Sequence, residues 1–512
     1  MPKSTLHDWR NARNNIAAPS ESVRFLEGEE GQEFLQRLVH CALFHFHENN
    51  GASIYSISDW LHSAGLDVFT ACKPSYLKGL AQKMQEEICR FGDEQKNALA
   101  PKMPETSISV AQDEKFFRNK PCLVGIDLDS NYILLEKMAD NRKADTWNQN
   151  MSQAMEGLPV NIIQSVSDEG NSLLKHVKDS LSASHSPDTY HIVQDVGRSG
   201  AASLRMKERH RHKELQEATE KTVKLAAKIT QIPDDKKNIH KKETAELSLN
   251  KQQKKEIEAL QCLQQAQLKA KEFKRGRKAI GRNYHPYDLQ NGLRQSPEKV
   301  EALIKRNMLQ CKEAIEDLGQ KAHDKLEKAR RLIPAMKKTL IFYFSMAAVY
   351  LDKYNFDFRT RGLIEDELMP AAYLQLASRK EKNKKERSRL LALSKEKLID
   401  LSSKNGPYSY YSDKQLNEMW DVACNAVKFF QRSSSCVEGR NAQLTLKYHN
   451  LHRLSKRKLN ALTVIHNFHL RRSDGTTAAQ RFFKQTHENL LNTILERMPA
   501  LSRPRKHLPK AA

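Results

Sequence analysis

Three short apolar runs, each rich in residues that favour β-strands, follow one another in the second hundred residues of the chain. They are Ser107–Val110, Cys122–Leu128 and Tyr132–Met138. Turn-forming residues separate them, with Asn119–Lys120–Pro121 before the second run and Asp129–Ser130–Asn131 before the third. The pattern predicts three antiparallel strands that follow one another as a meander.

Carboxylates stand near the ends of two predicted strands. The first strand runs into Asp113 and Glu114. A later apolar run, Val160–Val166, is also a predicted strand, and Asp168 and Glu169 follow it. A pair of acids therefore follows each of these two predicted strands.

The elements around these acids give a mixed α/β order. Helical spacing is expected over Ala144–Met155 and Asn171–Leu181, and a last strand over Tyr190–Val196. The predicted order is β-β-β-α-β-α-β, in which the first strand is central and the fourth lies parallel beside it. Asp113 and Asp168, near the carboxyl ends of these two strands, would then face one crevice.

The chain before this region is predicted to be helical. Residues 1–24 are polar and are expected to form a loose arm, whereas a short helix at Leu61–Ala64, a stop at Gly65 and a longer helix at Tyr76–Phe91 outline a helix-turn-helix within residues 25–100. The side chains expected to reach a DNA groove are Tyr76, Lys78, Gln82 and Lys83. An ordinary helical hairpin without DNA contact has the same pattern.

From about residue 204 to residue 401 the chain is rich in Lys, Glu, Gln, Ala and Leu, which predicts long charged helices. Two are expected within residues 204–275, with a break at Ile232–Pro233–Asp234–Asp235, and another spans 296–331 with Ser296 as its cap. Sustained apolar heptads are absent, so a long coiled coil is not expected. Residues 275–292 predict a basic loop with aromatic side chains, which would either lie on a DNA backbone or form a packed turn.

Mixed composition returns after residue 412. Helices are predicted over Lys414–Phe430, over 436–451 with a cap among 433–435, over Leu454–Arg471, and over Ala478–Phe483. A basic tail is expected at the end of the chain.

The charge of the chain narrows the choice of partner. Its 512 residues include 85 Lys and Arg against 62 Asp and Glu, a net charge of +23. Such an excess favours a polyanion such as nucleic acid, with a solvated basic surface as the alternative. No apolar run reaches the ~20 residues of a membrane span, and the longest, Leu340–Leu351, predicts a buried helix.

The cysteines and the N-terminus bear on the compartment. The eight cysteines contain no CxxC pair and no zinc-finger spacing, which predicts reduced thiols in a cytosolic protein. The N-terminal segment lacks the apolar region of a secretory signal.

A polyanionic partner and acids at two strand ends together favour metal-dependent phosphoryl transfer on nucleic acid. Two divalent ions ~3.5–4 Å apart activate the attacking oxygen and stabilise the leaving one. Mg²⁺ prefers oxygen ligands, chiefly carboxylates and water. Such a site takes about three carboxylates, so a third acid is expected from a helix packed against the sheet.

Four stretches of the chain resemble a DDE-type transposase of a bacterial insertion sequence, a family with an RNase H-like catalytic core. They are VAQDEKF with the meander behind it, VNIIQSVSDEG, HSPDTYHIVQD, and SSSCVEGRNAQL with the LHRLSKRKLNALTVIHNFHLRRSDGTTAAQRFF that follows. The resemblance covers residues 105–200 and 430–485. It implies that Asp113, Asp168 and Glu438 are the catalytic residues and hold two Mg²⁺ ions, for which Mn²⁺ would substitute.

The resemblance also implies how the chain is divided and what it binds. The expected parts are an arm (1–24), a helix-turn-helix-like domain (25–100), the first part of the core (105–203), a helical insertion (204–430), the second part of the core (431–490) and a basic tail (491–512). The implied partner is double-stranded DNA, both the transposon ends and the target, and the protein is expected to bind it as a homodimer. The implied location is the bacterial cytoplasm, in association with the nucleoid. No membrane partner is expected.

Other roles are open for the acids. Asp127 and Asp129 are alternatives to Asp113 as the first ligand, and are otherwise hairpin acids satisfied by solvent or turn amides. Asp168 would otherwise cap the helix that follows it, and Glu438 would otherwise be a first-turn acid favoured by the helix dipole.

The basic residue of the family pattern is also open. Many insertion-sequence enzymes carry Lys or Arg two helical turns after the Glu, where this chain has Thr445. The candidates to replace it are Arg440, Lys447, Arg453 and Arg457. Asp188 and His191 resemble an Asp-x-x-His element that some of these transposases carry.

The leading hypothesis is a cut-and-join recombinase, in which activated water cleaves the element end and the freed 3′ hydroxyl attacks target DNA. A nuclease of the same fold without strand transfer is the near alternative, and strand joining separates the two. A non-catalytic DNA-binding scaffold is the third; it would bind DNA equally with or without Mg²⁺ and would never nick it.

Overall fold

The computed structural model describes residues 20–233, 237–401, 406–451 and 454–503. The described chain is mostly helical, with one five-stranded mixed sheet. It forms two compact units: one contains the residues up to His185 and from Ser434 onward, and the other is Ser186–Ser433. This agrees with an α/β core and a large helical part, although the helical unit begins earlier than residue 204.

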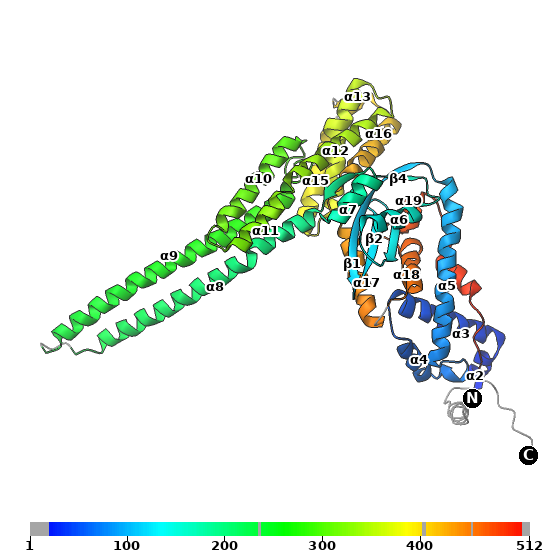
Figure 1. The fold of residues 1–512 in the computed structure, drawn as a ribbon, viewed down its shortest axis with the longest axis horizontal. Helices are drawn as coiled ribbons and strands as arrows, with labels where there is room; N and C mark the ends of the chain where they lie inside the picture. The colour runs from blue at the N-terminus through cyan, green and yellow to red at the C-terminus, as the bar shows by residue number, and fades with distance from the viewer. Residues whose placement is uncertain (1–19, 234–236, 402–405, 452–453, 504–512) are drawn as a thin grey trace, which may run out of the picture. The chain divides into compact units, whose positions relative to one another are not determined.

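The sheet belongs to the first unit (Figure 1). Its strands are β1 (Thr106–Phe117), β2 (Lys120–Asp127), β3 (Ile133–Met138), β4 (Val160–Ser167) and β5 (Ser184–Pro187). They lie in the order β3-β2-β1-β4-β5, with β1 antiparallel to β2, β2 antiparallel to β3, and β1 parallel to β4. The meander and the central first strand are confirmed.

The prediction that the first strand ends at Asp113 was wrong. Strand β1 continues to Phe117, and Asp113 pairs with Val124 of β2 within the ladder. Polar residues from Asp113 to Lys115 hid this continuation, because the apolar run that marked the strand stops before them.

The predicted strand Tyr190–Val196 was also wrong, since these residues are the first turns of helix α8 (Thr189–Thr230). The side chain of Asp188 caps this helix, accepting a hydrogen bond from the backbone N of Tyr190 at 2.8 Å. Ile192 and Val196, spaced four residues apart, are both buried on one face of the helix. The cap and the packing therefore outweigh the strand-favouring composition of this segment.

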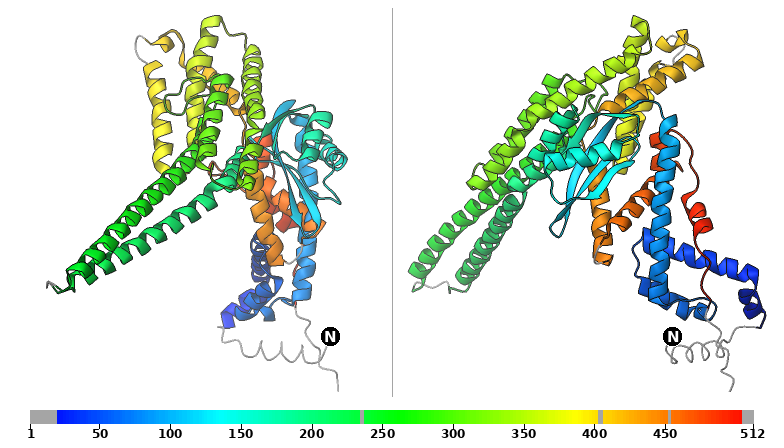
Figure 2. Two further views of the ribbon diagram at one scale, coloured as in Figure 1. Left: turned by 60° about the vertical axis from the view of Figure 1, so that its left-hand side comes forward. Right: turned by 45° about the vertical axis from the view of Figure 1, so that its right-hand side comes forward.

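Helices cover both faces of the sheet (Figures 1 and 2). One face is covered by α17 (Ser435–Leu451) and α18 (Lys456–Phe468), and the other by α6 (Ala144–Met155) and α7 (Asn171–Lys175, continued by a π-helical turn, His176–Ser180). The core under α17 and α18 includes Ala111, Val124, Ile126, Val437, Leu444, Leu459 and Leu462. The core under α6 and α7 includes Val110, Leu123, Leu135, Trp147, Met151 and Leu173.

A glycine lets α6 lie close to the sheet. Gly125 of β2 faces Met151, and a Cβ on that glycine would lie only 2.9 Å from the Met151 Cε. Neighbouring residues of β1 and β2 alternate between the two cores, as expected of a strand buried on both faces.

The N-terminal helices share a core with the late helices of the same unit. They are α2 (Ser20–Glu27), α3 (Glu29–Ala42) with its π-helical extension Leu43–Asn49, α4 (Ile54–Ser63) and α5 (Pro74–Leu99); the late ones, besides α18, are α19 (Ala478–Phe483) and α20 (Leu490–Arg497). Helix α20 lies where a basic tail was expected, and its Leu490 and Ile494 are buried. Residues 504–512 lie outside the described residues, as do 1–19 of the predicted arm.

The predicted helix-turn-helix is only partly realised. Helices α4 and α5 exist, but residues 64–73, with a short 3₁₀ turn, separate them, which is longer than the tight turn of that motif. Lys78, Gln82 and Lys83 are exposed on α5, whereas the Tyr76 hydroxyl accepts a hydrogen bond from the backbone N of Ser502 at 2.7 Å. Three of the four expected groove-facing side chains are thus accessible.

Over its described residues after β5, the second unit consists of helices and their connections, with an isolated β-bridge between Tyr287 and Arg294. Its helices are α8, α9 (Ile239–Asn283), α10 (Pro297–Ala314), α11 (Gln320–Arg330), α12 (Ile333–Asp352), α13 (Phe358–Leu363), α14 (Met369–Lys380), α15 (Lys384–Leu401) and α16 (Asp413–Ala426). Residues 296–331 were predicted as one helix but form α10 and α11, and Ser296 caps α10 as expected.

Helices α8 and α9 lie side by side along most of their length (Figure 2). The shielded positions of α9 recur at alternating spacings of three and four: Ala245, Leu249, Gln252, Glu256, Ala259, Leu263, Ala266 and Ala270. This heptad spacing corrects the expectation that none is present. It was missed because Ala, Gln and Glu fill much of the seam, with polar contacts such as Thr219 Oγ1 to Glu256 Oε1 at 2.6 Å.

The segment 275–292 is a packed turn, not a free basic loop. Helix α9 runs through its first half to Asn283, and the aromatic residues Tyr284, His285 and Tyr287 are buried. The His285 Nδ1 lies 2.7 Å from the Tyr373 hydroxyl.

One helical stretch of the described residues, Gln320–Asp352, has the length and apolar composition of a membrane span, a property shared by core helices. Within it the predicted helix Leu340–Leu351 is part of α12. Leu340, Tyr343, Ala347 and Leu351 are buried along one side of α12, which is the side that packs in the core of its unit.

Candidate active site

Strand alternation decides which acid of the first pair faces α17. Asp113 lies on the same side of β1 as Ala111, and its Oδ2 accepts a hydrogen bond from Asn441 Nδ2 of α17 at 2.7 Å. Its Oδ1 accepts from the backbone N of Glu114 at 2.8 Å. Glu114 points to the opposite side, where its Oε1 accepts from Trp147 Nε1 of α6 at 3.2 Å.

Asp168 follows β4, the strand parallel to β1. The two strands pair Ala111 with Val166, and Asp113 and Asp168 each stand two residues beyond this pair, the spacing of residues on one side of an extended strand. Asp168 does not cap α7, because the N-cap residue is Gly170. Instead, its Oδ1 accepts from the backbone N of Gly170 at 3.2 Å.

Glu438 lies in the first turn of α17, whose position a buried ion pair fixes. Arg440 donates to both carboxylate oxygens of Glu136 on β3, at 2.7 and 2.6 Å, and the Thr463 hydroxyl of α18 donates to the same carboxylate at 2.7 Å. The helix that carries Glu438 is therefore held to the sheet two residues further on.

The three predicted acids are brought together. Burial, followed by the negative charges of Glu438 and Asp168, raises the pKa of Asp113 to about 7, although the hydrogen bond from the Glu114 backbone N opposes this. Because both other acids act on this pKa, the side chains of Asp168 and Glu438 each lie in the neighbourhood of Asp113. They come from β1, from the end of β4 and from α17.

The chemistry of this donor set fits a hard divalent cation. Carboxylate oxygens are the ligands that Mg²⁺ prefers, and a cation would relieve the repulsion among these acids. Among the described residues, no group of three or more His, Cys, Asp and Glu side chains is already arranged as a metal-ligand set. The acids are therefore near one another without forming a closed coordination shell by themselves.

A histidine that the sequence did not single out lies beside the second acid pair. His185 of β5 has its Nε2 3.1 Å from the Ser167 hydroxyl and its Nδ1 3.8 Å from Glu169 Oε1. Burial lowers its pKa to about 4, against the opposing effect of Asp168. Its place just after the helix that follows Asp168 is the sequence signal that could have indicated it.

Asp188 and His191 belong to the other unit. Asp188 is the cap of α8, and its Oδ2 lies 3.8 Å from His191 Nε2. This separation is that of residues one turn apart on a helix.

The alternative first ligands have different surroundings. Asp127 is buried at the end of β2, and its Oδ2 accepts from the backbone N of Ser130 at 2.9 Å and from the Ser130 hydroxyl. It is the turn-satisfied hairpin acid that was one of its two possible roles. Asp129 is exposed in the same turn.

The described basic candidates on the late helices form ion pairs or hydrogen bonds with other parts of the first unit. Arg440 is buried against Glu136, and Lys447 Nζ donates to the backbone O of Asn49, where burial lowers the pKa of the lysine to about 8. Arg457 pairs with Glu86 on α5. Arg453 lies outside the described residues.

The raised pKa of Asp113 predicts a pH-dependent stability. The folded protein holds this proton more tightly than the unfolded chain, so the group stabilises the fold at low pH and this contribution is lost as pH rises from about 4 towards about 7. Metal-free Asp113→Asn should therefore gain melting temperature over wild type at about pH 8, with a smaller gain at about pH 5. A gain that does not depend on pH in thermal melts would contradict the burial and charge argument.

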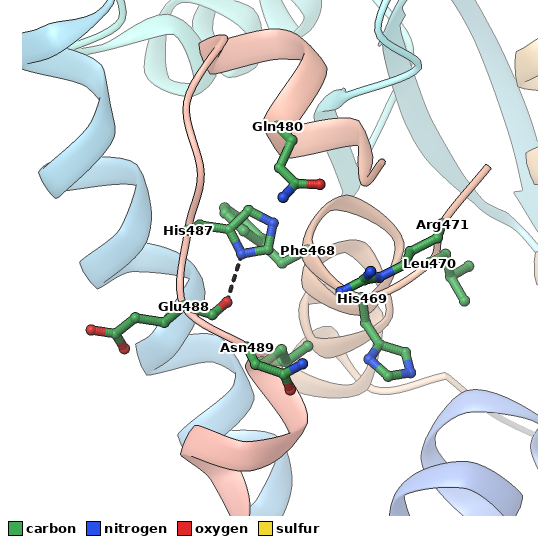
Figure 3. Close-up of a pocket in the computed structure, with 9 residues that line it drawn as sticks. Phe468, His469, Leu470, Arg471, Gln480, His487, Glu488 and Asn489 are labelled. Carbon is green, nitrogen blue, oxygen red and sulfur yellow. Dashed lines mark hydrogen bonds between the residues drawn. The ribbon is translucent and has the colours of Figure 1, made fainter. Parts of the chain in front are cut away.

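A separate pocket of about 400 Å³ lies at the end of α18 (Figure 3). It is lined by Phe468, His469, Leu470, Arg471, Gln480, His487, Glu488, Asn489 and Leu490. The His487 ring is fixed on both sides, with Nδ1 2.6 Å from the backbone O of Glu488 and Nε2 2.7 Å from the Thr477 hydroxyl. The pocket shares no residue with the acid cluster.

Comparison with known families finds a match in the later part of the chain. A family of unknown function, DUF6399, matches residues 364–510. This segment includes α17 with Glu438 and Asn441 but neither Asp113 nor Asp168. A search of curated proteins finds no match.

Proposed function

We propose that the protein is a DDE-type DNA transposase with an RNase H-like catalytic core. The observation that carries the proposal is that Asp168, just after β4, and Glu438, on α17, both lie in the neighbourhood of Asp113 on β1. The sheet order β3-β2-β1-β4-β5, with α17 packed on the central strands, supports the same fold.

The proposed reaction is phosphoryl transfer on DNA. Divalent ions held by Asp113, Asp168 and Glu438 would supply charge stabilisation to the attacking and leaving oxygens. The role of the chain in this proposal is to position the three acids. The paired strands β1 and β4 hold the two aspartates side by side, and α17, which packs on one face of the sheet, contributes the glutamate. Water first attacks the phosphodiester at the element end, and the freed 3′ hydroxyl then attacks a target phosphodiester.

The remainder of the chain suits a DNA substrate under this proposal. The net charge of +23 favours contact with phosphates, and the insertion between the second and third acids carries many lysines and arginines on α8 and α9. Lys78, Gln82 and Lys83 on α5 are accessible for a groove. Joining two DNA ends calls for a homodimer.

A plasmid assay tests the proposal. Supercoiled plasmid carrying the DNA that flanks this reading frame on both sides is incubated with the protein and Mg²⁺ or Mn²⁺, alongside a second plasmid as target. We expect metal-dependent cuts at the element ends, 3′ hydroxyl termini and joined products. Cleavage without joining would support the nuclease instead, and DNA binding without any metal-dependent nick would support the scaffold.

A further inference from the structure

Asn441 lies on the same face of α17 as Glu438, one turn later along the helix. Its side chain is buried, with the residue only 5 % exposed. It therefore stands beside the acids inside the protein, not on the surface.

The amide of Asn441 is satisfied on one side only. Its Nδ2 donates to Asp113 Oδ2 at 2.7 Å, but its Oδ1 is buried and has no hydrogen-bond partner among the described residues. Buried polar atoms without a partner are rare in folded proteins, and where one occurs it often faces a bound water or ion. Since both amide atoms belong to one planar group, the oxygen lies next to Asp113 whichever way the amide is turned.

The surroundings of this oxygen make a cation a better partner for it than a hydrogen-bond donor. The side chain that the structure places against this amide is the Asp113 carboxylate, which accepts hydrogen bonds when ionised and does not donate them. Amide oxygens are ordinary ligands of hard divalent cations. The terminal torsion of asparagine is broad and roughly two-fold, so the amide can present either atom to Asp113.

We propose that Asn441 is a metal ligand, whose amide oxygen joins Asp113, Asp168 and Glu438 around a divalent cation. The inference rests on the proposed function and adds a fourth protein oxygen to that site. In the metal-free protein the amide N–H donates a hydrogen bond to Asp113. When a cation binds there, the N–H is repelled, the amide turns, and the oxygen faces the cation.

Calorimetric titration of the full-length protein with Mn²⁺ alone tests this. Asn441→Leu, which removes both amide atoms at similar volume, should weaken Mn²⁺ binding by about 10- to 100-fold. Asn441→Asp keeps an oxygen ligand and should bind Mn²⁺ within about threefold of wild type. Gln443→Leu, on the exposed side of the same helix, is the matched control and should leave binding unchanged.

The aspartate variant separates a ligand from a positioning residue. If Asn441 served only to donate to Asp113, Asn441→Asp would remove that donor, add repulsion and weaken Mn²⁺ binding as much as Asn441→Leu does. That result, or unchanged binding in Asn441→Leu, overturns the inference. A thermal melt gives a second readout: Mn²⁺ should raise the melting temperature of Asn441→Asp by about as much as that of wild type, and that of Asn441→Leu by less.

Two further variants complete the test. If Asn441→Leu does not fold, Asn441→Ser removes the amide with less change in polarity and is titrated in its place. Asp168→Asn reports on the proposed function: unchanged Mn²⁺ affinity in that variant would overturn the whole metal site. Weakened binding in Asp168→Asn with wild-type binding in Asn441→Leu would overturn only the role of Asn441.

Discussion

Asp168→Asn is expected to abolish strand cleavage while leaving DNA binding intact. The neutral amide has the shape of the carboxylate and can still accept from the backbone N of Gly170, so the turn after β4 keeps its structure. It loses the negative charge that a divalent cation requires. We expect cleavage to fall by at least about 10²- to 10³-fold, the size of effect seen when a key electrostatic group is lost.

Gel assays of plasmid cleavage and of end binding measure the two properties separately. Asp129→Asn is the matched control, because Asp129 is exposed in the meander turn and should be dispensable. Cleavage at the wild-type rate by Asp168→Asn would remove Asp168 from the site. Loss of cleavage in Asp129→Asn would return that residue to the position of first ligand.

Arg440→Met is expected to destabilise the first unit far more than substitution of an exposed charged residue does. The Arg440–Glu136 pair is buried at both ends, and the Thr463 hydroxyl adds a third hydrogen bond to the same carboxylate. Removing the guanidinium leaves Glu136 as a buried charge without its cation. Breaking such a pair costs about 3–5 kcal/mol.

Urea unfolding of the metal-free protein, followed by circular dichroism, measures the loss. Arg37→Met, at an exposed position of α3, should change stability by no more than about 0.5 kcal/mol. The double substitution Arg440→Met with Glu136→Met should recover most of the loss, because two apolar side chains of suitable size leave no buried charge. A loss below about 1 kcal/mol in the single variant would show that water or another cation reaches Glu136.

The predicted elements succeeded where the pattern is local. The meander was visible because β-prone runs alternate with turn residues, and β4 because a short apolar run is bounded by Pro159 and by acids. The predicted cap at Ser296 likewise marks the helix that follows it.

The predictions failed where a competing local or tertiary interaction determined the structure. Tyr190–Val196 has strand composition, but the Asp188 cap and burial of Ile192 and Val196 on one side make it helical. The α8–α9 seam has heptad spacing without heptad apolarity, so the register became visible only when the two helices were seen together. Arg440 resembled a free basic residue because its partner Glu136 lies 304 residues away.

By itself, the sequence determined the strand-bearing segment, the long charged helices, the excess positive charge and the acid pairs that follow two β-prone runs. Only the tertiary structure decided which of these acids meet. The alternation of β1 places Asp113 and Glu114 on opposite sides, but which side matters depends on where α17 packs. That packing is set by burial and by the Glu136–Arg440 pair, contacts between residues far apart in the chain, which no local pattern encodes.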